Sequence, residues 1–277
     1  MILIQISDSH IEAPGVLTYG MFDAAASLAK VIDAINARDP QPDVVIHTGD
    51  LVHHGEAAQY PPAREILAKL RAPLYAIPGN HDRREGFAAA FADQSWLPKD
   101  SPFIQYTVED FPVRLVGLDT VIPGSPDGAL CAERLAWLDS QLTAQPERPT
   151  IVACHHSPFA TGLTGSTRVG FEEGGREFAA ILAKHAQVQR VICGHSHRPM
   201  LGTFGHRPFW VAPGTCYQFE AGFSAARTLS LTQEPPGYSL HLWLDDPVAG
   251  PSLVSHHIPV GDFGEPQVLL RNGKRVG

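Results

Sequence analysis

Residues 188–197 read VQRVICGHSH, an apolar run that ends in a glycine and two histidines one residue apart. The β-branched residues of this run predict a buried strand, and Gly194 permits a tight turn where the strand ends. His195 and His197 lie two positions apart, so on an extended strand end their side chains share a face. The stretch therefore predicts a strand end whose two imidazoles share a face and could bind metal.

Four more polar clusters follow apolar runs earlier in the chain. They are Asp8-Ser9-His10, Gly49-Asp50, Gly79-Asn80-His81-Asp82 and His155-His156. Taken singly, each is ordinary turn or loop chemistry. Together with the GHSH stretch they supply carboxylate and amide oxygens and imidazole nitrogens, the ligands that divalent transition metals prefer. The combination predicts a dinuclear metal site.

The spacing within the clusters indicates how they could share two ions. Asp8 and His10 are two apart, so both can face one metal from the end of a strand. Asp50 follows a glycine at a strand end, and its two carboxylate oxygens could bridge two cations. Asn80 offers a neutral amide oxygen. Because ligands in α/β sheets gather at the carboxyl ends of strands, all five clusters are expected to meet.

Apolar runs alternate with helical patterns along most of the chain. We expect helices near residues 21–38, 62–70, 85–92, 133–142 and 176–185, and strands near 2–6, 43–47, 74–77, 104–108, 113–118, 150–154 and 188–193. This alternation indicates an α/β fold. Extra hairpin-like strands favour a four-layer α/β/β/α sandwich of two mixed sheets, with a small C-terminal β-rich cap element.

The character of the chain changes after residue 200. We expect residues 1–200 to form the catalytic core and residues 201–277 to add the final core strands plus a cap or oligomer-interface element. Strands are expected near 209–212, 227–231, 238–243 and 253–258. The glycine- and threonine-rich stretch 161–175 is expected to be a mobile loop near the site.

Composition excludes several classes of protein. The chain has 277 residues, 44% of them hydrophobic and 18% charged, as in ordinary globular proteins. Its formal net charge of −8 argues against polymeric nucleic acid as a partner, since that requires a basic face. It shows no signal peptide and no membrane-spanning run, so we expect a cytoplasmic protein. Cys131, Cys154, Cys193 and Cys216 lack metal-site spacing and are expected to be free thiols.

The ordered series of five clusters resembles the calcineurin-like metallophosphoesterase superfamily, over residues 1 to about 199. Within it, the stretch Gly49-Asp50-Leu51-Val52 followed by Gly55 and Tyr60 is similar to the bacterial glycerophosphodiesterase and class III cyclic-nucleotide phosphodiesterase branch. The run Ala212-Pro213-Gly214-Thr215 also resembles that branch.

The resemblance implies roles for individual residues. One metal would be held by Asp8, His10, Asp50 and His197, and the second by Asp50, Asn80, His156 and His195. His81 would lie near the leaving group as proton donor or electrostatic stabiliser. The resemblance selects His156 as the ligand, which leaves His155 on the opposite face of the strand as a packing or supporting residue. His53 or His54 could touch substrate, but supporting or solvent-exposed roles are expected.

The implied activity is metal-dependent hydrolysis of small phosphodiesters, such as glycerophosphodiesters or cyclic nucleotides. Two cations would bind the phosphoryl oxygens and lower the pKa of a bound water, whose hydroxide would attack in line. The ligand types suit Fe, Mn, Zn or Co alike. The expected partners are a small phosphodiester substrate and further copies of the chain in a homo-oligomer, a dimer or larger.

Other functions remain open on the same residues. A phosphomonoesterase, a protein phosphatase or a nuclease could use the same scaffold, and a protein phosphatase would be expected to place extra arginines beside the metals. Arg83 and Arg84 are the obvious candidates for that role. A non-catalytic interaction scaffold would be expected to have lost ligands, whereas this chain keeps all of them.

Overall fold

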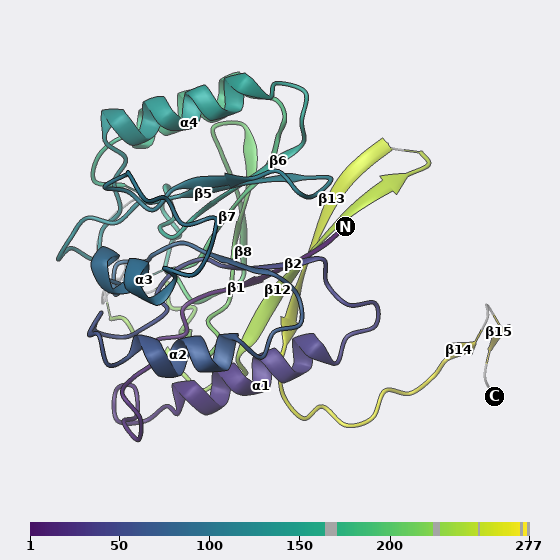
Figure 1. Ribbon diagram of the computed structural model, residues 1–277. Helices are drawn as coiled ribbons and strands as arrows, with labels where there is room; N and C mark the ends of the chain where they lie inside the picture. The colour runs from purple at the N-terminus through teal and green to yellow at the C-terminus, as the bar shows by residue number, and fades with distance from the viewer. Residues whose placement is uncertain (164–170, 224–227, 249, 272–273, 276–277) are drawn as a thin grey trace.

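Two mixed β-sheets form the centre of the molecule (Figure 1). The computed structural model describes residues 1–163, 171–223, 228–248, 250–271 and 274–275. The first sheet has the order β13-β12-β1-β2-β3, with strands Gly250–Pro259, Gly237–Asp246, Ile2–Ile6, Val44–His47 and Leu74–Ala76. The second has the order β4-β5-β6-β7-β9-β8, with strands Tyr106–Val108, Arg114–Leu118, Thr150–Cys154, Val188–Cys193, Arg207–Val211 and Met200–Phe204.

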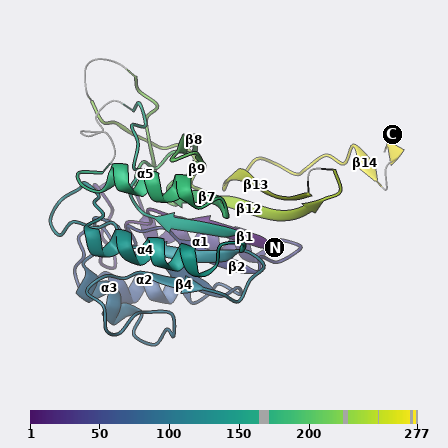
Figure 2. The same ribbon diagram turned by 90° about the horizontal axis from the view of Figure 1, so that it is seen from above.

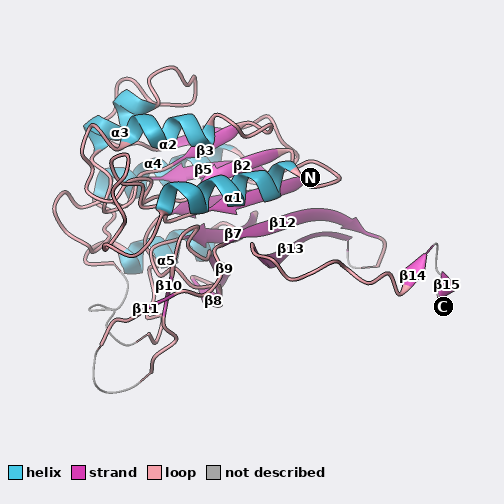
Figure 3. Cartoon of the chain, turned by 90° about the horizontal axis from the view of Figure 1, so that it is seen from below, coloured by secondary structure: helices cyan, strands magenta, loops and turns pink. Residues whose placement is uncertain are grey.

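The helices cover the outer faces of the two sheets (Figures 1 and 3). The helices α1 (Ala24–Asn36), α2 (Tyr60–Leu67) and α3 (Arg84–Ala90) pack on the first sheet, and α4 (Ala132–Ala144) and α5 (Gly175–Lys184) on the second. A third apolar cluster fills the space between the sheets, where Leu3 and Ile46 meet Ile151 and Ile192. The four-layer α/β/β/α sandwich predicted from the sequence is therefore confirmed.

Helix α1 illustrates how the sequence specifies these elements. The Asp23 side chain caps the helix by accepting a hydrogen bond of 2.9 Å from the Ala26 amide. Leu28, Val31 and Ile35 recur at helical spacing, and all three are fully buried against the first sheet. Capping and periodicity thus agree on both the start and the buried face of the helix.

The parallel strands all point their carboxyl ends toward one edge of the sandwich. In the first sheet β1 runs parallel to β2 and β2 to β3. In the second sheet β5, β6 and β7 are parallel to one another. The predicted hairpin of strands near 104–108 and 113–118 is confirmed as the antiparallel pair β4 and β5. This arrangement brings the loops after β1, β2, β3, β6 and β7 together.

The segment after residue 200 is divided between the two sheets. The antiparallel pair β8 and β9 extends the second sheet, while β12 pairs antiparallel with β1 and carries β13 to the edge of the first. Figures 1 and 2 show β12 and β13 reaching past the sandwich, with the C-terminal segment leading away from it. The short pairs β10 (Gln218–Phe219) with β11 (Leu231–Thr232), and β14 (Leu270–Arg271) with β15 (Lys274–Arg275), stand apart from both sheets.

Two expectations fall partly outside the described residues. The predicted strand 227–231 is largely wrong: residues 228–230 form no strand, and β11 covers Leu231–Thr232. Residue 227 lies outside the described part of the chain. The centre of the 161–175 loop, residues 164–170, also lies outside the described part. The four cysteines are free thiols, as predicted. Over the described chain, no helix has the length and apolar character needed to cross a membrane.

Candidate metal centre

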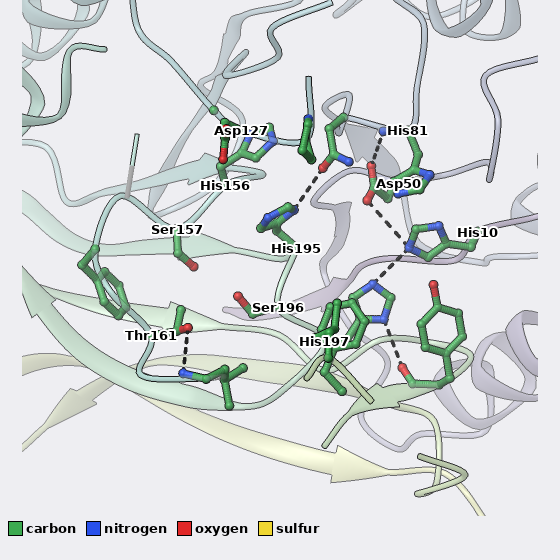
Figure 4. A pocket seen from close by; sticks show the side chains of 18 of the residues that line it. His10, Asp50, His81, Asp127, His156, Ser157, Thr161, His195, Ser196 and His197 are labelled. Carbon is green, nitrogen blue, oxygen red and sulfur yellow. Dashed lines mark hydrogen bonds and ion pairs between the residues drawn. The ribbon is translucent and has the colours of Figure 1, made fainter. Parts of the chain in front are cut away.

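The five polar clusters meet at the shared carboxyl edge of the strands (Figure 4). Asp8 and His10 follow β1, Asp50 follows β2, and Asn80 follows β3. From the second sheet, His155 and His156 follow β6, and His195 and His197 follow β7. Apart from Asn80 and His195, these side chains belong to residues that are buried almost completely. The predicted site residues are thus brought together from both halves of the sandwich.

The paired residues do not lie on extended strand ends, as their spacing had predicted. Strand β1 ends at Ile6, and beyond it Asp8 and His10 have φ angles of 55° and 47°. After β7, His195 and His197 likewise have φ angles of 68° and 45°, and Asp50 has 55°. Such left-handed backbone costs roughly 1–3 kcal/mol per residue outside glycine and is concentrated at functional sites. The convergence of these side chains therefore depends on tight loops rather than on strand alternation.

Glycines allow these loops to approach one another closely. A Cβ atom on Gly79 would collide with the Asp50 carboxylate. A Cβ atom on Gly194 would collide with Ser7 and the Asp8 carboxylate. In both motifs the glycine before the functional residues leaves room for a carboxylate from a neighbouring loop.

Asp8, His10, Asp50 and His197 form a first donor set. The Nε2 atoms of His10 and His197 lie 3.0 Å apart, and His197 Nε2 lies 3.3 Å from Asp8 Oδ1. His10 Nε2 lies 3.7 Å from Asp50 Oδ2. Atoms that share a zinc-sized ion at about 2.0–2.2 Å are separated from each other by roughly 3.0–3.6 Å. The distances among His10, His197 and Asp8 therefore fit a single coordination sphere, and Asp50 lies at its margin.

Asp50, Asn80, His155 and His195 form a second donor set. Asn80 Oδ1 lies 3.0 Å from His195 Nδ1 and 3.1 Å from His155 Nε2. His155 Nε2 also lies 3.2 Å from Asp50 Oδ2. Since Asp50 belongs to both sets, its carboxylate stands between them, as the sequence had suggested for a shared ligand.

Hydrogen bonds to backbone carbonyls fix which ring nitrogen of His197 and of His155 faces the donor sets. Because a carbonyl oxygen only accepts, His197 donates from Nδ1 to Tyr217 O at 3.1 Å and keeps the Nε2 lone pair for the first set. His155 donates from Nδ1 to Thr48 O at 2.8 Å and turns Nε2 toward Asp50 and Asn80. Such outer hydrogen bonds are usual for metal-binding histidines. Burial acts to lower the pKa of His155, but Asp50 and Asp8 raise it to about 9, so a metal ion at Nε2 would take the place of a proton.

The His156 ring lies away from Asp50 and Asn80, the residues that His155 contacts. Its Nδ1 lies 2.8 Å from the Thr120 hydroxyl, and its Nε2 is buried with no hydrogen-bond partner. The ring lies beside that of His195, with centroids 4.8 Å apart, and lines the cavity over the site. His155 and His156 thus both reach the site, but only His155 is within 3.2 Å of Asp50 and Asn80.

His81 lies over Asp50 and is held at two points. Its amide donates a hydrogen bond of 2.8 Å to Asp50 Oδ1. Its Nδ1 donates to the His53 carbonyl at 2.6 Å. With Nδ1 committed, Nε2 is the ring atom left for proton chemistry in the cavity that His81 lines.

Burial and charge set the protonation of the donors. Burial lowers the pKa of both His195 and His197 to about 3, so both rings are neutral at pH 7. Burial acts to raise the pKa of Asp50, but the neighbouring histidines, His155 above all, hold it well below its usual range. A carboxylate and neutral imidazoles are the forms that bind metal ions.

A cavity of about 220 Å³ opens above the two donor sets (Figure 4). Sequence reasoning missed Tyr19 and Tyr217, which line it. The Tyr217 ring stacks on His10 and His197, with centroid distances of 5.5 and 4.6 Å. Lone aromatic residues carry no local signal of such a role. Tyr217 was detectable only through its position two residues after the Ala212-Pro213-Gly214-Thr215 run.

An ion pair behind the site supports the loop that carries Thr120. Arg84 donates to both oxygens of the fully buried Asp119 carboxylate, at 2.7 and 2.9 Å. Asp119 also accepts from the Ile104 and Val121 amides. Arg84 is therefore a structural residue in this fold.

Replacing Arg84 with alanine is expected to lower the free energy of unfolding by roughly 2–4 kcal/mol, because it leaves a buried carboxylate without its main counter-charge. Urea unfolding monitored by circular dichroism measures this difference. Arg83→Ala, at an exposed neighbouring position, is the control and should unfold like the wild type. Equal stabilities of the two variants would contradict the assigned role of Arg84.

Comparison with known proteins identifies the family. The family model for calcineurin-like phosphoesterases matches residues 1–199, the span that holds all five clusters. The chain belongs to this family. The family assignment made from the clusters alone is therefore confirmed, as is the prediction of a metal-dependent hydrolase. His/Asp groups that could hold a metal ion occur at the centre of this calcineurin-like fold.

Several curated relatives of this calcineurin-like protein match it over most of their length. It is 32% identical over 266 residues, 96% of each chain, to a probable glycerophosphodiester phosphodiesterase, GpdQ, from Arcobacter nitrofigilis. It is 34% identical to a probable cyclic nucleotide phosphodiesterase from Rhodopseudomonas palustris, covering 86% of this chain and 87% of the relative. It is 31% identical to the 3',5'-cyclic adenosine monophosphate phosphodiesterase CpdA of Escherichia coli, over 79% of this chain and 77% of the relative.

Solved structures share the calcineurin-like fold at low sequence identity. A dimetal phosphatase from Danio rerio superposes with a TM-score of 0.61 at 14% identity, covering 94% of this chain and 99% of that one. A purple acid phosphatase from yellow lupin gives a TM-score of 0.64 at 16% identity, over 95% of this chain and 52% of the lupin chain. These likenesses support the fold.

Proposed function

We propose that this protein hydrolyses small phosphodiesters, glycerophosphodiesters or cyclic nucleotides, with two divalent metal ions. The observation that carries the proposal is the pair of four-residue donor sets that share Asp50 beneath one cavity. Relatives named as phosphodiesterases of these two substrate classes support the choice of reaction.

The residues at the site fit metal ions. The Nε2 atoms of His10 and His197 face each other at 3.0 Å with Asp8 alongside, an arrangement that a shared cation would stabilise. His156 Nε2 is buried beside the second set without a partner. When bound, two cations roughly 3.5–4 Å apart would neutralise the phosphoryl oxygens and activate water for attack. Fe, Mn, Zn and Co all suit these ligands.

We infer that Asp8, His10, Asp50 and His197 hold the first ion, as the sequence predicted. For the second ion, the distances support Asp50, Asn80, His195 and His155 in place of the predicted His156. His155 Nε2 points at both Asp50 and Asn80, whereas the His156 ring bonds Thr120 and lies beside His195. His156 is then a neighbour of the site that lines the cavity and bonds Thr120.

His81 is proposed to assist departure of the leaving group. Its Nδ1 donates to the His53 carbonyl, so a proton delivered to the substrate has to come from Nε2. Its amide bond to Asp50 fixes the ring next to the shared carboxylate. His81 is thereby held beside the donor sets as a proton donor and is not itself a metal ligand.

Replacing His81 with alanine is expected to slow turnover by about 10²-fold while leaving the metal content close to that of the wild type. Steady-state kinetics with bis(p-nitrophenyl) phosphate, combined with metal analysis of the purified variant, measures both quantities. Loss of both metals in the variant would contradict the role proposed for His81.

The cavity supports a small ester rather than a polymer or a dianionic monoester. Its volume of about 220 Å³ is below the usual range of ligand pockets, roughly 300–1,000 Å³. None of the described residues that line it is lysine or arginine. Arg84, a candidate for a phosphatase-like role, is bound to Asp119 instead, and Arg83 is exposed outside the cavity lining. Among the described residues, the protein phosphatase alternative therefore lacks its expected arginines beside the donor sets.

A substrate panel tests the proposed function. The metal-supplemented protein should hydrolyse bis(p-nitrophenyl) phosphate, cyclic AMP or glycerophosphodiesters in preference to p-nitrophenyl phosphate. A strong preference for the monoester would overturn the proposal. No hydrolysis of any ester, together with less than one bound transition metal per chain, would favour a non-catalytic scaffold.

Three further expectations from the sequence remain predictions. They are the division into residues 1–200 and 201–277, the homo-oligomer and the cytoplasmic location. Analytical ultracentrifugation of the full chain addresses the oligomer directly.

A further inference from the structure

The buried ring of His53 contacts His10 on the side away from the donor sets. Its Nδ1 lies 3.2 Å from His10 Nδ1, and the residue is 6% exposed. The two rings meet edge to face, with centroids 5.3 Å apart. His10 presents its other nitrogen, Nε2, to the first donor set. His53 therefore contacts the first donor set through the His10 ring.

The contact between the two Nδ1 atoms determines where the protons lie. If His10 Nε2 binds a cation, it carries no proton, and the neutral His10 ring must carry its proton on Nδ1. A hydrogen bond of this proton to His53 then requires a bare Nδ1 on His53, whose own proton lies on Nε2. The other three histidines of the donor sets have no histidine as partner for Nδ1. His155 and His197 donate from Nδ1 to backbone carbonyls, and His195 turns Nδ1 toward Asn80.

The same residue also holds the proposed proton donor. The His53 carbonyl accepts from His81 Nδ1 at 2.6 Å. The two rings stack, with centroids 5.2 Å apart and an interplanar angle of 18°. His53 thus contacts a predicted metal ligand with its ring nitrogen and the predicted catalytic residue with its ring face and carbonyl.

We propose that His53 is a positioning residue whose Nδ1 accepts a hydrogen bond from His10 Nδ1. This bond fixes the tautomer of His10, and the face of the His53 ring orients His81. The inference rests on the proposed function for its catalytic meaning. Outer hydrogen bonds of this kind orient metal-binding histidines and raise their basicity. A side-chain acceptor, unlike a backbone carbonyl, can be removed by a single substitution.

Glu12, His53 and His54 offer an alternative use of the same ring. One ligand atom of each lies within 4.8 Å of the others, so the three could hold a further cation. Binding through His53 Nε2 would move the His53 proton to Nδ1, which would then donate to His10 Nδ1 and force a proton onto His10 Nε2. A cation at this place therefore excludes the neutral arrangement proposed above, and the two alternatives can be told apart.

Two substitutions separate the acceptor from the ring. His53→Phe keeps an aromatic face for His81 but removes the acceptor, and should weaken Zn²⁺ binding at the first donor set about 10–100-fold. His53→Asn keeps an acceptor atom near the Nδ1 position and should stay close to the wild type in Zn²⁺ affinity. His54→Phe is the matched control, because His54 lies next in sequence, is exposed and pairs with Glu12. Calorimetric Zn²⁺ titration of the full-length proteins measures all four affinities.

The proposal is overturned if His53→Phe binds Zn²⁺ as tightly as the wild type, or if His54→Phe is weakened equally. Should His53→Phe not fold, the tautomers decide the question. Long-range ¹H–¹⁵N spectra of the Zn²⁺-loaded wild type should show a proton on His10 Nδ1 and a bare Nδ1 on His53. A proton on His53 Nδ1, or a third Zn²⁺ per chain, would contradict it.

The two proposals fail in different ways. A wild-type protein that binds Zn²⁺ but cleaves no phosphodiester would refute the proposed function and leave the tautomer result intact. Diester hydrolysis with a protonated His53 Nδ1 would refute the role of His53 alone.

Discussion

Replacing Asp50 with alanine is expected to reduce phosphodiester hydrolysis by about 10³-fold or more, because one carboxylate serves both metal positions. Asp50 Oδ2 lies 3.7 Å from His10 in the first donor set and 3.2 Å from His155 in the second. Its Oδ1 accepts from the His81 amide, so the substitution also releases the proposed proton donor.

The variant is tested by hydrolysis of bis(p-nitrophenyl) phosphate together with metal analysis after supplementation. Asp139→Ala is the control, since it removes a carboxylate from helix α4, where Asp139 pairs with Lys184 far from the site. The control should keep wild-type activity and metal content. An Asp50→Ala protein that retains two metals and full activity would contradict the shared-ligand arrangement.

Replacing His155 with alanine is expected to lower activity by about 10²-fold or more through loss of the second metal ion. The reason is geometric: His155 Nε2 lies 3.1 Å from Asn80 Oδ1 and 3.2 Å from Asp50 Oδ2. His156→Ala is the matched comparison at the next residue and should lose less activity and retain its metal. Metal content of the two variants, measured side by side, distinguishes them. The opposite pattern would restore His156 as the ligand that the sequence predicted.

Much of the fold follows from local patterns in the sequence. In α1, Leu28, Val31 and Ile35 give both the helix and its buried face. The runs Ile2–Ile6 and Val188–Cys193 predict strands because buried parallel strands need continuous apolar residues. The division of the last strands between two sheets was not predictable in detail, since the pairing of β12 with β1 joins residues more than 230 positions apart.

The site was predictable in its members more than in its geometry. Residue type and order identify Asp8, Asp50, Asn80 and the GHSH histidines, because few combinations other than a metal site need all of them. The left-handed backbone at Asp8 and His10 leaves no clear mark in the sequence. The two side chains lie together as predicted, but they do so through a tight loop and not because they share one face of a strand.

The choice between His155 and His156 shows the same limit. Adjacent residues after a strand point in different directions, and the turn that follows β6 decides which ring reaches Asp50. That turn is set by contacts from distant segments, such as the bond from His155 to Thr48 O. Residues that act through their carbonyls, as Tyr217 does for His197, are invisible to motif analysis because any residue type has a carbonyl.

Anomalous diffraction from crystals of the metal-supplemented protein would locate the metal ions directly. We expect two anomalous peaks about 3.5–4 Å apart, with the Asp50 carboxylate between them. One peak should lie among Asp8, His10 and His197, and the other among Asn80, His155 and His195. A single peak, or two peaks that do not share Asp50, would rule out a dinuclear site bridged by this carboxylate.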